Sequence, residues 1–195
     1  MRIGKLRFSS GFLLLCSWLL YRDQSGIVWL GLISCVLHEL GHILCLSLLG
    51  SHVKEITITI FGAKIEFENY LSYVEELIVA AAGPAVNLSL ALVCNFFLFQ
   101  TFAGVNLALS VFNLLPVGPL DGARILYCLT AQLGNDSLSH RIDSCVTFTF
   151  TAVSGVTGVL IALYGGNLTL LFMCLWLLTG TPQNISTKFD QKEWK

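Results

Sequence analysis

Charged side chains are scarce in this sequence. They make up 12% of its 195 residues, whereas hydrophobic side chains make up 55%. A soluble domain carries about 25% charged residues, which it needs to cover its surface. The composition therefore indicates a membrane protein. The sequence also lacks any strongly basic tract, so nucleic-acid binding is not expected.

The cysteines lack the arrangement of a disulfide framework. There are seven, an odd number, and no two of them form a CxxC pair. Most lie inside apolar runs, at Cys16, Cys35, Cys45, Cys94 and Cys174. A free cysteine in such a place behaves as a small hydrophobic residue, so we assign these side chains to packing.

Long apolar runs are what the sequence does contain. They cover residues 8–21, 27–49, 77–102, 105–115, 145–164 and 168–179. The first run resembles a signal peptide, but no small-residue cleavage site follows it, so we interpret it as a retained anchor. The pattern predicts an all-α polytopic membrane protein with about six transmembrane helices, of which the fourth and sixth are short.

One segment between the second and third runs has a different residue pattern. In residues 53–69, Ile56, Ile58 and Ile60 alternate with threonines, which is the periodicity of a strand. We expect a short β-hairpin here. Open sheet edges are not tolerated against lipid, so this hairpin should lie in protein or at the membrane interface.

The basic residues indicate which side of the membrane each loop faces. If the N-terminus is inside, the inside segments are the N-terminus, 50–76, 116–144 and the C-terminus. They contain every one of the 11 lysines and arginines except Arg22. Cytoplasmic loops carry such an excess, so both termini are predicted to be cytoplasmic.

The second apolar run contains the motif HExxH, at residues 38–42. Residues four apart lie on one helix face, so His38 and His42 can direct imidazole nitrogens at a single Zn²⁺. Glu39 is offset by one residue, where its carboxylate can take a proton from the attacking water. Ionisable residues inside an apolar span are costly, which favours a functional role over accidental spacing.

A catalytic zinc site needs a third protein ligand and one open position. Asp121 is the strongest candidate, because it follows a segment in which Pro116, Gly118 and Pro119 break the helix. Broken backbone at membrane depth implies a protein-lined or wet cavity. The spacing alone leaves open that Asp121 is a helix N-cap instead.

Several motifs together resemble a known family. Residues 38–42 read HELGH, residues 82–87 read AGPAVN, residues 112–116 read FNLLP and residues 119–124 read PLDGAR. In this order, over residues 27–130, they look like the site-2 protease family of intramembrane zinc metalloproteases, peptidase family M50. The layout is most similar to the compact subgroup that includes the stage IV sporulation protease of endospore-forming bacteria.

The resemblance implies roles for six residues. His38, His42 and Asp121 would hold zinc, and Glu39 would be the general base. Asn87 and Asn113 would line the cleft, where they would contact the substrate backbone or steady the site. The alternative for these two asparagines is interhelical hydrogen bonding, since a polar amide in lipid needs partners.

The chain departs from the family at residues 122–123, where Gly-Ala replaces the usual Gly-Gly. No PDZ-like insert and no nucleotide-sensing domain is recognised, so we expect one protease domain with a core at 27–130 and a helical pair at 145–179. The expected partner is a membrane-spanning or membrane-tethered substrate, with a regulatory factor precursor as one candidate. A regulatory membrane partner and a homo-oligomer both stay open.

The expected function is zinc-dependent hydrolysis of a peptide bond within the membrane. The alternative is a non-catalytic metal-binding scaffold of the same fold, which loss of Glu39 or of a metal ligand would favour. A zinc transporter is a third class. It needs acceptor groups along a path through the bilayer, and the first, fifth and sixth apolar runs contain no aspartate, glutamate or histidine to provide them.

Overall fold

A computed structural model gives the architecture of the chain. It describes residues 2–3, 6–51, 53–59, 62–67, 71–133, 136–164, 173–174 and 177. Within these residues six helices and four strands follow one another in the order β1-β2-α1-α2-β3-β4-α3-α4-α5-α6. The chain divides into two compact units, residues 1–113 and residues 114–195.

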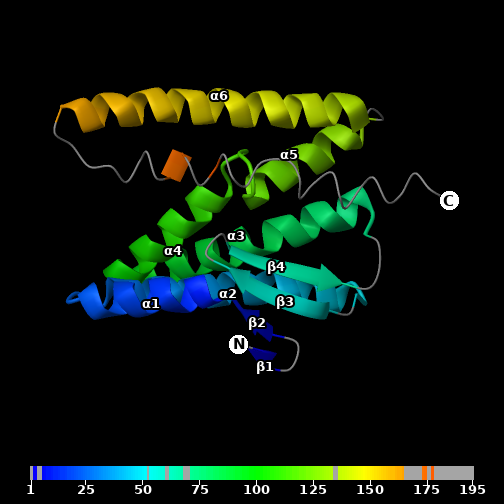
Figure 1. Ribbon diagram of the computed structural model, residues 1–195. Coiled ribbons are helices and arrows are strands. Elements are labelled where there is room, and N and C mark those ends of the chain that lie inside the picture. The colour runs from blue at the N-terminus through cyan, green and yellow to red at the C-terminus, as the bar shows by residue number, and fades with distance from the viewer. Residues whose placement is uncertain are drawn as a thin grey trace. The chain divides into compact units, whose positions relative to one another are not determined.

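The first unit contains four helices. They are α1 (Ser10–Arg22), α2 (Ile27–Leu48), α3 (Tyr73–Phe96) and α4 (Gln100–Asn113). The helices α2, α3 and α4 pack against one another (Figure 1). A capping box begins α3: Ser72 Oγ accepts the backbone N–H of Glu75, and the Glu75 carboxylate accepts the backbone N–H of Ser72.

The same unit contains a four-stranded sheet in the order β1-β2-β3-β4. The strands are β1 (Arg2–Ile3), β2 (Leu6–Phe8), β3 (Val53–Thr59) and β4 (Gly62–Phe67). The hairpin β3–β4 is antiparallel and occupies the segment where the isoleucine alternation indicates strands. The N-terminal strands were not expected: β2 pairs in parallel with β3, with Arg7 opposite Thr57.

The two faces of α2 have opposite character. Ser34, His38, Gly41 and His42 are buried, whereas Val36, Leu40 and Leu44 are 50–62% exposed. A water-soluble helix buries its apolar face instead. Among the described residues, Ile27–Leu48, Tyr73–Phe96 and Ser137–Leu163 are long and apolar enough to cross a membrane. Together these features indicate a membrane protein.

Some helix boundaries differ from the apolar runs. The run at 77–102 is divided, because α3 ends at Phe96 and α4 begins at Gln100. Leu98 adopts a positive φ of 65° in the turn between them. The turn itself is apolar, so hydropathy does not mark it. The helix α1 has 13 residues, which is shorter than the ~20 that span a bilayer. The count of six spans stays a prediction.

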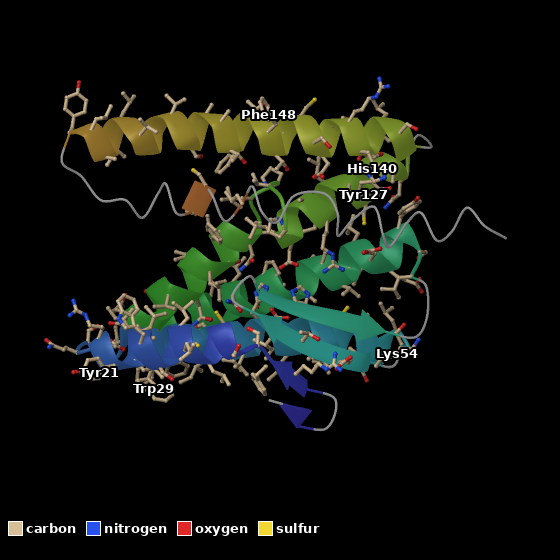
Figure 2. All side chains as sticks on the ribbon, in the orientation of Figure 1. Tyr21, Trp29, Lys54, Tyr127, His140 and Phe148 are labelled. Atoms are coloured by element: carbon tan, nitrogen blue, oxygen red, sulfur yellow. The ribbon has the colours of Figure 1, made fainter. Side chains whose placement is uncertain are left out.

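The second unit contains α5 (Asp121–Ala131) and α6 (Asp136–Leu163), which pack together. Figure 2 shows Tyr127 of α5 next to His140 of α6, and the Tyr127 hydroxyl is 3.3 Å from His140 Nε2. The predicted fifth span, 145–164, is the later part of α6. The predicted sixth, 168–179, lies outside the described residues except at 173–174 and 177.

Candidate metal site

The two histidines of HExxH meet on the buried face of α2. Each is only 5% exposed. Their Nε2 atoms are 3.2 Å apart, and their rings stand edge to face at 80°. Two nitrogens that each lie ~2.0–2.1 Å from one tetrahedral zinc are separated by roughly 3.3–3.4 Å. The spacing of the pair therefore fits two ligands of one metal.

The helix α3 orients the second of these histidines. His42 Nδ1 lies 2.7 Å from the carbonyl oxygen of Val79. Because a carbonyl can only accept, Nδ1 carries the proton and Nε2 keeps its lone pair for a metal. A hydrogen bond from the remote ring nitrogen to a carbonyl is the usual support of a metal-binding histidine.

The backbone of α3 lies directly against the two imidazoles at Gly83. A Cβ built on Gly83 would meet His42 Nε2, and it would stand 2.8 Å from His38 Nε2. The point at which the two nitrogens converge is thus open only because residue 83 has no side chain. Two converging imidazole nitrogens around such a space suit a divalent transition metal such as zinc.

Glu39 follows His38 on the same helix and is half-buried. It comes one residue after His38, so its Cα is turned roughly 100° around α2 from that of His38, which lets it adjoin the histidine pair without replacing either ring. A carboxylate there can accept a proton from a water that attacks next to the metal. The role of Glu39 as the base stays a prediction.

Asp121 belongs to the second unit, where it is buried and is the first residue of α5. Leu120 occupies the N-cap position, so Asp121 is not the helix cap. The positive end of a helix dipole favours its carboxylate charge. The guanidinium of Arg124 stands 3.8 Å from one carboxylate oxygen. The role of Asp121 as third ligand stays a prediction.

Gly122 holds the start of α5 against the preceding turn. A Cβ there would meet the backbone carbonyls of Leu114 and Leu115. The neighbouring Ala123 is completely buried, so the fold accommodates the methyl group by which the chain departs from Gly-Gly. The helix-breaking segment at residues 116–119 is also held by α6, because the backbone N–H of Gly118 donates to Thr147 Oγ1 at 3.0 Å.

The two asparagines have different surroundings. Asn87, on α3, is 0% exposed, and no group among the described residues hydrogen-bonds its amide nitrogen or oxygen. Asn113, the last residue of α4, is half-buried and donates from Nδ2 to the carbonyl of Leu109. Their roles toward a substrate stay predictions. Gly83 and Gly122 each stand inside a quoted motif, but the motifs alone do not show which backbone or ring atoms lie against them.

Comparison with known proteins identifies the family. The profile of peptidase family M50 matches residues 26–101 and 95–156. This is well over half of the chain and includes the histidine pair, Gly83 and Asp121. The chain belongs to peptidase family M50.

Individual relatives agree with this assignment. Protein sll0528 of Synechocystis sp. is 36% identical over 152 residues, which are 63% of this chain and 38% of that protein. Stage IV sporulation protein FB of Bacillus subtilis is 27% identical over 64% of this chain and 47% of its own length. A zinc metalloprotease of Methanocaldococcus jannaschii is 28% identical over 77% of this chain and 47% of its own length. The chain thus spans less than half the length of these curated relatives.

A solved structure has the same fold. The site-2 protease from Methanocaldococcus jannaschii matches with a TM-score of 0.70 and 23% sequence identity. The match covers 92% of this chain and 91% of that one. The expected fold class is confirmed at the level of a mostly helical site-2 protease fold.

Proposed function

We propose that this chain is a zinc-dependent intramembrane endopeptidase. His38, His42 and Asp121 would hold the metal, and Glu39 would be the general base. The observation that carries the proposal is the buried pair of Nε2 atoms 3.2 Å apart, with a carboxylate on the adjoining residue of the same helix. The relatives named for zinc metalloprotease activity support zinc as the metal.

The three ligands supply a donor set suited to zinc. Two imidazole nitrogens and one carboxylate oxygen can hold one ion, and they leave the fourth position that catalysis requires. When bound, zinc polarises the scissile carbonyl and makes water a stronger nucleophile at neutral pH. The Val79 carbonyl contributes by fixing the His42 tautomer.

Glu39 would move the proton. Its carboxylate accepts a proton as water attacks the carbonyl carbon and forms the new C–O bond. It then gives that proton to the amide nitrogen as the C–N bond breaks, so the products are a carboxylic acid and an amine. Placement beside the histidines lets one carboxylate serve both transfers.

The substrate would be a membrane-spanning or membrane-tethered protein. A transmembrane helix satisfies its own backbone hydrogen bonds, so a segment must unwind before a peptide bond can be cleaved. Because β2 covers one side of β3, β4 is the hairpin strand at the edge of the sheet. We propose that unwound substrate pairs with β4 by strand addition, and that Asn87 and Asn113 line the cleft, where they contact the substrate backbone or steady the site.

Purified protein should cleave a candidate membrane-tethered client only when it is loaded with metal. The expected result is cleavage that stops on treatment with a chelator and returns when zinc is added, because the histidine pair alone supplies no electrophile. Cleavage is measured from the sizes of the client fragments on a denaturing gel. A client that binds to loaded protein without being cut would favour the scaffold function.

The charge distribution also predicts a topology. We propose that residues 1–195 act as one domain in a bacterial cell membrane, with both termini and the segment around Arg141 on the cytoplasmic side. Reporter fusions after residues 141 and 195 should be active only with a cytoplasmic reporter, and a fusion after Arg22 only with an external one. An external C-terminus would contradict the expected pair of spans at 145–179.

A further inference from the structure

The helices α2 and α3 approach each other closely at two glycines. A Cβ on Gly41 would meet the Val86 side chain at 2.9 Å and the Ala82 carbonyl oxygen at 3.0 Å. A Cβ on Gly83 would instead meet ring atoms of both histidines, including His42 Cε1 at 2.7 Å. Both glycines therefore permit close packing, but only Gly83 faces the nitrogens that would bind a metal.

We propose that Gly83 is a positioning residue for the metal. Its bare backbone would form the wall of the coordination sphere on the α3 side and keep open the point where the Nε2 lone pairs converge. This inference rests on the proposed function and deepens it, because it names a residue that shapes the metal site without binding the metal.

Neither side of this contact can withdraw easily from an added methyl group. His42 is tied to α3 by its hydrogen bond to the Val79 carbonyl, one turn before Gly83. The backbone of α3 is held from the other side, where Ser110 Oγ of α4 donates to the Pro84 carbonyl at 2.9 Å. Non-bonded carbon atoms prefer a separation of ~3.5–4.0 Å. A methyl group at residue 83 must therefore turn an imidazole away or fill the space that the metal needs.

Three alanine variants separate this role from ordinary helix packing. Gly83→Ala should lower zinc affinity by ~10–100-fold or more. This is the range for loss of a group that supports a metal-binding residue without binding the metal itself. Gly41→Ala adds the same group to the same α2–α3 contact, where it would meet Val86, the Ala82 carbonyl and, at 3.3 Å, the Cα of Gly83, but no ring atom among its nearest neighbours. It should therefore retain much more zinc than Gly83→Ala, while its Tm falls. Gly31→Ala, in open space on α2, should change neither.

Zinc per chain after dialysis against a graded zinc buffer gives the affinities. The absorption spectrum of the cobalt-substituted protein gives the coordination directly. Gly83→Ala should lose the tetrahedral cobalt bands, and Gly41→Ala should keep them. A disturbance of packing alone would not move this spectrum.

A double-mutant cycle with His42 keeps the test decisive if Gly83→Ala folds poorly. All four chains are compared with metal removed, so that Tm reports packing alone. Gly83→Ala should lower Tm less on a His42→Ala background than on the wild type, because the nearer of the two rings that the methyl group would meet is gone.

Two results would overturn the inference while leaving the proposed function intact: wild-type zinc affinity in Gly83→Ala, or an equal loss of zinc in Gly41→Ala. Equal Tm losses on the two backgrounds would also count against it. Wild-type protein that binds no zinc would be a failure of the proposed function itself, which these experiments detect separately.

Discussion

Replacing Glu39 with glutamine should lower peptide cleavage by at least the ~10²–10⁴-fold that a general base contributes, while zinc stays bound. Glutamine has nearly the same size as glutamate but cannot accept a proton from water. The hydrogen bond from His42 Nδ1 to the Val79 carbonyl does not involve residue 39, so it should stay in place and hold this ligand. A client should then accumulate in complex with the variant, since recognition is intact.

Glu75→Gln is the matched control. It makes the same chemical change in the same unit, and glutamine can replace glutamate in the capping box that begins α3. Cleavage and zinc content of this control should equal those of wild type. Cleavage by Glu39→Gln at the wild-type rate would show that the mechanism is wrong. Loss of zinc in Glu39→Gln would mean that this residue has a structural or ligand role.

Replacing a residue that binds the metal should instead abolish zinc binding and peptide cleavage together. His38→Ala, His42→Ala and Asp121→Ala should each reduce zinc affinity by more than the ~10–100-fold that loss of an outer partner costs. Wild-type protein should carry one zinc per chain. Asp121→Ala is the most informative of the three, because its role in binding metal is the least supported by direct geometry.

Asp143→Ala provides the control for Asp121. Asp143 is also a buried aspartate of the second unit, on α6, at 5% exposure. If loss of any buried carboxylate from this unit reduced zinc binding, Asp121→Ala and Asp143→Ala would lose zinc to the same extent. We expect Asp143→Ala to keep one zinc per chain by elemental analysis. Full retention of zinc in Asp121→Ala would show that another group is the third ligand.

Much of the fold could be predicted because apolar runs and short motifs are local signals. The apolar runs predict α2 and α3, and the isoleucine alternation predicts β3. The break at Leu98 could not be found in this way, because its neighbours are as apolar as the helices that flank it. The strands β1 and β2 could not be found either, since strands of two and three residues become regular only when β2 pairs with β3 and β1 pairs with β2.

The sequence by itself determined the chemistry of the candidate site. HExxH puts two imidazoles on one helix face and a carboxylate beside them, because the helical period fixes these directions locally. Tertiary structure alone decided how the pair is held. The Val79 carbonyl and Gly83 lie about forty residues along the chain from His42, and only the packing of α3 on α2 brings a hydrogen-bond acceptor and a bare backbone to the imidazoles.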